Sequence, residues 1–321
     1  MASLAAIAFN VGLLLASLTI ITFSGNYFVD ALINYAKKIG LSAYFIGMVV
    51  VSVATSSPDI VTAIMGLIAG RQEMMSGIIL GGLAIDLAFL NGWFAILAKR
   101  VKLETAVIKG IEMVVLGMMV LPYILMMDGE ISRSEGVVMV ISFIMYVLMI
   151  WNRETASGKL KHEIPLKRIW QDAAVFVLAL GAMLIAGRYA VLSSISLSNM
   201  LGIPIYIISL TVLAFAAALP DGIAGTIAIL KGKGGEIGFG ENIGTTMMEI
   251  NLFTGLLAIM TPMKFPVMGV IAGLVTLMLS SIYFLIILRK GVIDWKHGCV
   301  FIGLYVAFIT FEITRVLWWG A

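Results

Sequence analysis

The chain is long, strongly apolar and poor in charge: of its 321 residues, 61% are hydrophobic and 12% are charged, and the formal net charge is +3. A soluble domain carries about 25% charged residues, so the polar residues are too few to cover one or two water-soluble domains. Composition therefore excludes cytosolic enzymes, nucleic-acid-binding proteins and disordered chains. The single Cys299 cannot form an internal disulfide, which argues against a secreted disulfide-stabilised domain.

Ten apolar segments are candidates for crossing a bilayer, which takes about 20 mostly apolar residues. No Lys or Arg precedes the first segment, whereas a cleavable signal peptide starts with basic residues, so we expect this segment to stay in the mature protein. The sequence predicts an all-α, polytopic membrane protein with ten transmembrane helices. These segments run roughly over 4–36, 41–70, 75–98, 105–127, 134–151, 169–198, 201–230, 237–260, 265–288 and 294–319.

Basic residues gather in alternate loops between these segments. Cytoplasmic loops carry an excess of Lys and Arg, so this pattern predicts a protein of the cell membrane with both termini extracytoplasmic. The longest polar loop, 152–168, is then a cytoplasmic linker. The odd-numbered loops hold 15 of the 21 basic residues: Lys37, Lys38, Lys99, Arg100, Lys102, Arg153, Lys159, Lys161, Lys167, Arg168, Lys231, Lys233, Arg289, Lys290 and Lys296.

Two motifs occur twice in the chain. Segment 51–59 reads VSVATSSPD and segment 213–221 reads LAFAAALPD, so each places Pro-Asp after a run of small residues. Segment 77–86 reads GIILGGLAID and segment 240–249 reads GENIGTTMME, so each has two glycines four residues apart and an acid nine residues after the first. The chain therefore contains an internal repeat.

The two copies start on opposite sides of the membrane, because five spans separate them and five is an odd number. Inverted-topology repeats of this kind are typical of secondary transporters, whose sites lie near the bilayer midplane at interrupted helices. Pro58 and Pro220 each remove a backbone donor from such a helix, and the carbonyls freed there can bind cations. We expect two inverted five-helix repeats, 1–151 and 169–321.

Four acids, Asp59, Asp86, Asp221 and Glu249, lie within these apolar segments. A charged side chain at the bilayer centre costs about 3 kcal/mol on insertion scales. A purely structural role, with the acids paired or protonated, would account for one isolated acid. Matched positions in two repeats, with no basic residue in either motif, instead favour a cation site.

Carboxylate, carbonyl and hydroxyl oxygens suit hard cations such as Ca²⁺, Mg²⁺, Na⁺ or H⁺. Four carboxylates cannot all stay ionised around one divalent ion, because like charges repel. We therefore expect one or more of them to hold a proton in some states of a transport cycle.

At these residues the chain resembles the sodium/calcium exchanger family of the cation/Ca²⁺ exchanger superfamily, and it is identified as a divergent, prokaryotic-type member. That family has two α-repeats, each with a G-T-S-x-P-E signature and a G-N-x-x-G-S motif followed by Asn or Asp. The resemblance covers about 24–98 and 186–260, and it implies that Asp59 and Asp221 are the central carboxylates. It implies that the other ligands are Asp86, Glu249, Thr55, Ser56 and Thr245, with Ser52 one helical turn before Ser56 as an added oxygen.

The chain departs from the family pattern at several positions. The signature Glu is Asp in both repeats, so the cavity is larger or its ligands are moved. The second signature reads Ala216-Ala217-Ala218, so only backbone carbonyls, such as that of Ala217, can bind an ion there. The G-S step of the first repeat is Gly81-Gly82, and Asp86 stands where a neutral amide is common. These changes leave the sodium coupling open and favour a divalent-binding centre.

The resemblance implies a secondary active antiporter, not an enzyme, that exchanges a divalent cation, with Ca²⁺ favoured, for Na⁺ or H⁺ by alternating access. It needs no cofactor, its partners are the lipid bilayer and inorganic cations, and we expect a monomer to suffice for transport. Alternatives are an exchanger for Mg²⁺, Mn²⁺ or a monovalent cation and H⁺, an intramembrane aspartyl protease using Asp59 and Asp221 as a dyad, and a cation channel. The protease's G-x-G-D motif is absent, and inverted repeats favour alternating access over a channel.

Overall fold

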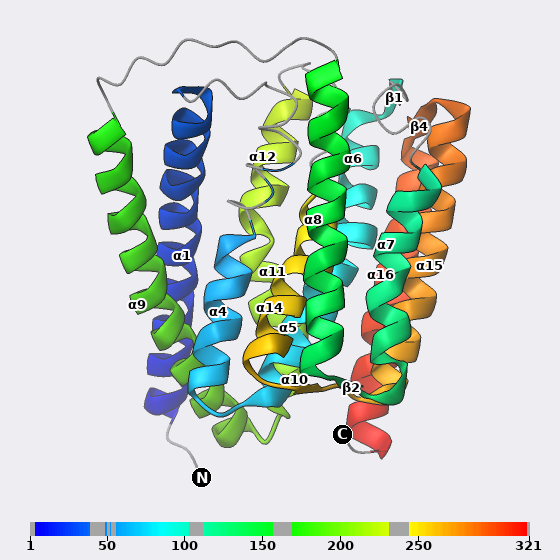
Figure 1. The fold of residues 1–321 in the computed structure, drawn as a ribbon. Helices are drawn as coiled ribbons and strands as arrows, with labels where there is room; N and C mark the ends of the chain where they lie inside the picture. Colours follow the sequence, from blue (N-terminus) through cyan, green and yellow to red (C-terminus); the bar gives the residue numbers. More distant parts are fainter. Residues whose placement is uncertain are drawn as a thin grey trace. The chain divides into compact units, whose positions relative to one another are not determined.

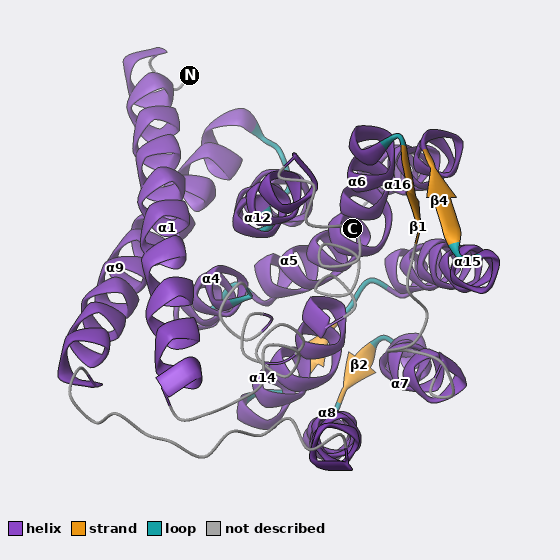
Figure 2. Ribbon diagram, turned by 90° about the horizontal axis from the view of Figure 1, so that it is seen from above, coloured by secondary structure: helices purple, strands orange, loops and turns teal. Residues whose placement is uncertain are grey.

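The computed structural model describes residues 4–38, 49, 52, 56–102, 112–156, 169–230 and 244–319. Helices make up most of these residues, with two short two-stranded ribbons (Figures 1 and 2). The chain forms two compact units, of which the first comprises Met1–Ile78 and Met145–Pro220 and the second Ile79–Ile144 and Asp221–Ala321. Each unit takes segments from both halves of the sequence. The predicted division into repeats rests on sequence similarity and stays a prediction.

Six helical segments are long and apolar enough to cross a membrane: Leu4–Phe28, Gln72–Ala98, Arg133–Asn152, Ala173–Leu201, Val267–Phe284 and Trp295–Trp318. Four shorter apolar helices, Ser57–Ile68, Met113–Asp128, Ile205–Ala217 and Gly244–Met260, lie at the four remaining predicted spans. The helical, multi-pass character that the sequence predicts is thus present in the described residues, and the count of ten crossings stays a prediction.

The first unit is built on two long helices, α1 (Leu4–Lys38) and α9 (Ile169–Leu201), that pack along each other (Figure 1). The rings of Phe28 and Phe176 stack between them, with centroids 4.5 Å apart. The remaining elements of this unit are α4 (Ser57–Ile68), the first part of α5 (Gln72–Ala84), the second part of α8 (Arg133–Ala156), α10 (Ile205–Ile208), the π-helix η5 (Ser209–Leu213), α11 (Ala214–Ala217) and the first two residues of α12 (Leu219–Leu230).

Gly25 of α1 lies against two prolines from distant parts of the sequence. A Cβ atom placed on Gly25 would lie 3.4 Å from Cγ of Pro58 and 4.0 Å from Cγ of Pro220. The structure thus brings together, within the first unit, the prolines of the two repeated Pro-Asp motifs.

The second unit holds the C-terminal end of α5, the N-terminal part of α8 and most of α12. It also holds the elements between α5 and α8 and those that follow α12. These are the π-helix η2 (Ile85–Leu90), α6 (Asn91–Ala98), β1 (Arg100–Lys102), α7 (Glu112–Leu125), the 3₁₀ helix η3 (Met126–Asp128), β2 (Glu130–Ile131), the π-helix η6 (Met248–Phe253), α14 (Thr254–Met260), β3 (Met263–Lys264), α15 (Val267–Lys290), β4 (Val292–Asp294) and α16 (Trp295–Trp319). Strand β1 pairs antiparallel with β4, and β2 pairs antiparallel with β3.

Asp294 caps the start of α16 beside the β1–β4 ribbon. Its Oδ1 accepts hydrogen bonds from the backbone N–H of His297 at 3.2 Å and of Lys296 at 3.0 Å. These bonds satisfy backbone donors that have no partner within the helix. They hold the pKa of the Asp294 carboxyl below its usual range, and the backbone N–H of His297 is the main cause.

Helices α6 and α16 approach each other at a pair of glycines. A Cβ atom on Gly298 would lie 2.6 Å from the carbonyl oxygen of Gly92, and one on Gly92 would lie 2.9 Å from the carbonyl oxygen of Gly298. Only glycine permits this separation, because any side chain would overlap backbone atoms of the facing helix. The contact holds α16 against α6, which continues from η2.

We predict that Gly298→Ala lowers the midpoint of thermal unfolding in detergent. Overpacking at such a contact costs about 1–3 kcal/mol, which corresponds to a decrease of about 1.5–4.5 °C for a chain of this size. Gly303→Ala in the same helix is the matched control, because a Cβ atom there meets nothing within 4 Å. An unfolding midpoint of Gly298→Ala equal to that of the control would contradict this packing.

Candidate cation-binding site

A residue in a turn stands two positions before each motif proline. Ser56 has φ −77° and ψ 0°, and Ala218, at the matching position of the second repeat, has φ −76° and ψ −6°. A proline is tolerated in the first turn of the helix that follows. Asp59 and Asp221 are in the first turns of α4 and α12, where the positive end of the helix dipole favours a carboxylate.

A turn is therefore present at both predicted places, at Ser56 and at Ala218. The backbone N–H of Ser56 still donates to the carbonyl of Ser52 at 3.1 Å, and that of Ala218 donates to Ala214 at 3.1 Å. In the second repeat the turn comprises Ala218 alone, because α11 ends at Ala217 and α12 begins at Leu219.

The other two acids both lie in π-helical turns. Asp86 is the second residue of η2, and Glu249 is the second residue of η6. Single π-helical turns within α-helices occur frequently at functional sites, because the additional residue in the turn changes the direction of the side chains. The two repeats thus share an irregularity of the backbone at the same place relative to an acid.

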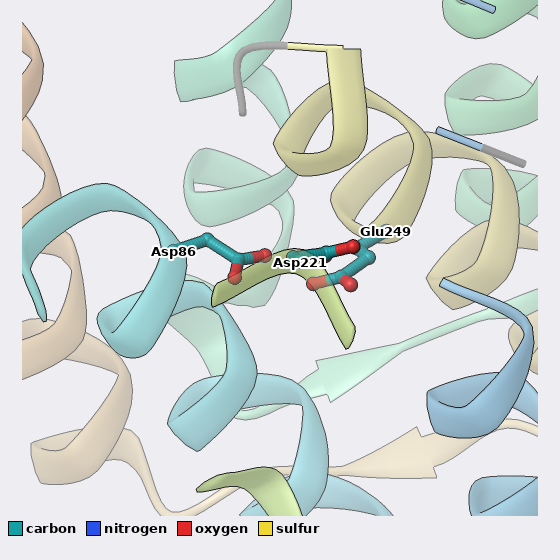
Figure 3. Close-up of side chains that lie close together, drawn as sticks. All are labelled: Asp86, Asp221 and Glu249. Carbon is teal, nitrogen blue, oxygen red and sulfur yellow. The ribbon is translucent and has the colours of Figure 1, made fainter. Parts of the chain in front are cut away.

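Three of the four predicted acids come together in the second unit. Asp86, Asp221 and Glu249 each offer a carboxylate oxygen, and these three oxygens all lie within 4.8 Å of one another (Figure 3). Their exposed fractions are 1%, 7% and 9%. Like charges at this distance repel strongly in a medium of low dielectric constant, so a bound divalent cation would stabilise the cluster. Buried carboxylate oxygens are the ligands that Ca²⁺ and Mg²⁺ prefer.

Thr245 supplies a further oxygen on the same helix as Glu249. It lies four residues before Glu249, and residues four apart share one face of a helix. Its side chain is completely buried, and within the described part of the chain its hydroxyl oxygen has no hydrogen-bond partner. A buried hydroxyl without a partner is costly, which makes Thr245 a candidate for a further ligand.

The remaining predicted ligands belong to the first unit or lie outside the described residues. Ser52, Ser56 and Ala217 are buried, and Asp59 is partly exposed. Among the described residues, the hydroxyl of Ser56 has no hydrogen-bond partner. Thr55 lies outside the described residues. The participation of these five residues in an ion site stays a prediction.

Two polar residues that the sequence patterns did not indicate donate to carbonyls of the π-helical turns. The hydroxyl of Thr254 donates to the carbonyl of Glu249 at 2.8 Å, and Nδ2 of Asn91 donates to the carbonyl of Leu87 at 3.0 Å. Thr254 and Asn91 each stand five residues after an acid. That equal spacing in both repeats was the signal by which the sequence could have indicated them.

Asn251 connects η6 to a neighbouring helix. Its Nδ2 donates to the carbonyl of Met118 in α7 at 3.2 Å. The side chain of Asn251 is buried, so this bond fixes the helix that carries Glu249 from a second direction.

A family model described as "Sodium/calcium exchanger protein" matches residues 9–152 and 172–314 of the chain. The match therefore includes both halves of the sequence and all four acids.

Individual relatives and solved structures are similar over most of the chain. The sodium/calcium exchanger MaX1 of Methanosarcina acetivorans is 25% identical, over 94% of this chain and 98% of its own length. The inner membrane protein YrbG of Escherichia coli is 24% identical, over 78% of this chain and 79% of its own length. A structure of the sodium-calcium exchanger NCX_Mj, soaked with 2.5 mM Na⁺ and 10 mM Sr²⁺, has a TM-score of 0.68 at 20% identity and covers 95% of this chain and 99% of that chain. The fold is that of a membrane exchanger.

We predict that Asp86→Asn reduces the stabilisation that Ca²⁺ gives the protein. The substitution removes one of three mutually repelling charges, so the unfolding midpoint without divalent cations should rise by about 2–4 °C per kcal/mol of repulsion relieved. The further rise on adding Ca²⁺ should shrink, because the stabilisation that a ligand gives the folded state increases with the logarithm of its affinity. Glu73→Gln, at an exposed acid in the first turn of α5, is the control. A Ca²⁺-dependent shift as large in Asp86→Asn as in the control would contradict a cation site at the cluster.

Proposed function

We propose that this chain, which belongs to the sodium/calcium exchanger family, is a secondary active antiporter that exchanges a divalent cation, with Ca²⁺ favoured, for Na⁺ or H⁺. The observation that carries the proposal is the buried cluster of three carboxylate oxygens from Asp86, Asp221 and Glu249. Membership of a family of cation antiporters makes the chain a transporter rather than an enzyme. The relative MaX1 is itself named a sodium/calcium exchanger.

The proposed architecture is ten transmembrane helices in two inverted five-helix repeats, with both termini extracytoplasmic and a monomer as the transporting unit. Matched backbone features support the repeat. The residues before the two Pro-Asp motifs have nearly the same φ and ψ, and each π-helical turn has its acid as the second residue.

We include Asp59 among the ligands because of its place in the motif. Asp59 and Asp221 each directly follow a proline, and both prolines approach Gly25 within the first unit. Ca²⁺ takes six to eight oxygen ligands, so three carboxylates need further donors. We assign these to side chains and a carbonyl at the remaining predicted positions: Thr55, Ser56, Ser52, Thr245 and the backbone of Ala217.

Exchange follows from the cost of moving charge. A carboxylate exposed to the bilayer core costs several kcal/mol. A site without bound cations therefore resists the rearrangement that would move its charged carboxylates through an apolar environment. Bound cations neutralise the acids and lower this cost. We propose that α1 and α9, which pack along each other in the first unit, then slide together as the site changes its access.

A second candidate is an exchanger for another cation, such as Mg²⁺ or Mn²⁺, on the same scaffold. The extra acid, Asp86, favours it, because a third carboxylate in the cluster changes the charge that the site must balance. Mg²⁺ demands near-ideal octahedral geometry and keeps several waters, whereas Ca²⁺ accepts irregular oxygen cages. Competition among these ions for the same site distinguishes the two candidates.

The proposal predicts Ca²⁺ uptake into proteoliposomes that runs uphill when an outward Na⁺ gradient or a pH gradient is applied. The measurement follows Ca²⁺ entry with each gradient in turn, the pH gradient being applied without Na⁺, and then with neither. Uptake that occurs only down the Ca²⁺ gradient would indicate a channel. Absence of Ca²⁺ uptake under every gradient, with Mg²⁺ or Mn²⁺ carried instead, would support the second candidate.

Asp59→Asn and Asp221→Asn should each abolish divalent exchange in the same assay and leave a folded protein. An amide keeps the shape of the side chain and removes the charge that binds the ion and drives coupling. Asp30→Asn is the control, because Asp30 is an exposed acid near the end of α1. Near-normal exchange by either signature variant would remove that residue from the site.

A further inference from the structure

The π-helical turn that carries Glu249 is held by two donors from one residue. Thr254, the first residue of α14, donates both its backbone N–H and its hydroxyl to the carbonyl oxygen of Glu249. The hydroxyl bond is 2.8 Å long, and Thr254 is completely buried.

Thr254 differs from other threonines in the described helices. Thr62, Thr211 and Thr314 each donate to the carbonyl four residues earlier in the chain, which is the usual local bond of a helical threonine. Thr254 instead reaches back five residues. Its hydroxyl therefore follows the hydrogen-bond pattern of the π-helix, and it strengthens that turn against the ordinary α-helical alternative.

Loss of the additional residue in the turn would redirect the Glu249 side chain. One residue corresponds to about 100° of rotation in an α-helix with 3.6 residues per turn. A change of this size would turn the Glu249 carboxylate away from Asp86 and Asp221. In the structure, one carboxylate oxygen of each of the three acids lies within 4.8 Å of the other two.

The first repeat has a comparable bond at its own π-helical turn. Asn91 begins α6, five residues after Asp86, and its Nδ2 donates to the carbonyl of Leu87 within η2 at 3.0 Å. The side chain of Asn91 is buried. This bond reaches back four residues, to the carbonyl that follows the acid, so only Thr254 bonds the carbonyl of the acid itself.

We infer that Thr254 is a positioning residue for the cation site: its hydroxyl maintains the π-helical turn and so keeps the Glu249 carboxylate next to those of Asp86 and Asp221. Thr254 does not contact the ion, and it acts through the backbone of the segment that carries a ligand. This inference rests on the proposed function of the carboxylate cluster.

The test compares Thr254→Val with Thr254→Ser in the proteoliposome exchange assay. Valine keeps the branched shape and removes the hydroxyl, whereas serine keeps the hydroxyl. Loss of a residue that orients a metal ligand typically weakens metal binding about 10–100-fold, so the Ca²⁺ concentration for half-maximal exchange should rise about 10-fold in Thr254→Val. The maximal rate at saturating Ca²⁺ should change much less, and Thr254→Ser should restore the wild-type half-saturating concentration.

The matched control is Thr314→Val, which removes a threonine hydroxyl bonded to a backbone carbonyl at 2.7 Å in α16. It should leave the half-saturating concentration unchanged. If Thr254→Val yields no folded protein, Thr254→Ala removes the same hydroxyl without the branched side chain.

An unchanged half-saturating concentration in Thr254→Val, or a Thr254→Ser variant as impaired as Thr254→Val, would overturn the positioning role. A fall in maximal rate alone would also overturn it, because a misplaced ligand weakens binding. Failure of the wild-type protein to exchange any divalent cation would instead refute the proposed function, so the two failures are distinguishable.

Discussion

The constraint on which the structure depends is the placement of three buried carboxylates within 4.8 Å of one another in a chain that is only 12% charged. Such a cluster is unfavourable by itself, because desolvation and mutual repulsion both oppose it. Two features of the backbone place these acids together. Asp221 stands in the first turn of a helix that begins just after the turn at Ala218, and Asp86 and Glu249 stand in π-helical turns. In the proposed site, a hard cation would convert this repulsion into coordination.

The irregular backbone persists because the regular parts around it pack closely. The glycines at 92 and 298 let α6 and α16 approach until backbone atoms meet, and those at 136 and 255 do the same for α8 and α14. Each of these contacts adjoins a segment that continues directly from a π-helical turn. Close packing without bulky side chains therefore fixes the elements whose irregular turns hold the acids, which is the pre-organisation that a selective binding site requires.

Much of this could be predicted from the sequence. Hydropathy indicated the helical segments, and matched positions in the two repeats singled out four acids, of which the structure brings together Asp86, Asp221 and Glu249, whereas the place of Asp59 in the site stays a prediction. The π-helical turns could not be predicted, because one additional residue in a turn changes neither composition nor hydropathy. The five-residue bond of Thr254 depends on that geometry, and Thr254 is by itself an ordinary polar residue in an apolar helix. The contact between Gly25 and the two motif prolines is long-range in sequence and left no local pattern.

The central claim is that Asp86, Asp221 and Glu249 bind one divalent cation. The most direct measurement is an anomalous difference map from crystals of this protein soaked with Sr²⁺, which is an oxygen-binding ion similar to Ca²⁺. The account predicts a single strong peak at about 2.3–2.6 Å or slightly more from carboxylate oxygens of these acids. That peak should vanish when an excess of Na⁺ or a low pH displaces the ion. A Sr²⁺ peak bound elsewhere, with the three carboxylates uncoordinated, would contradict it.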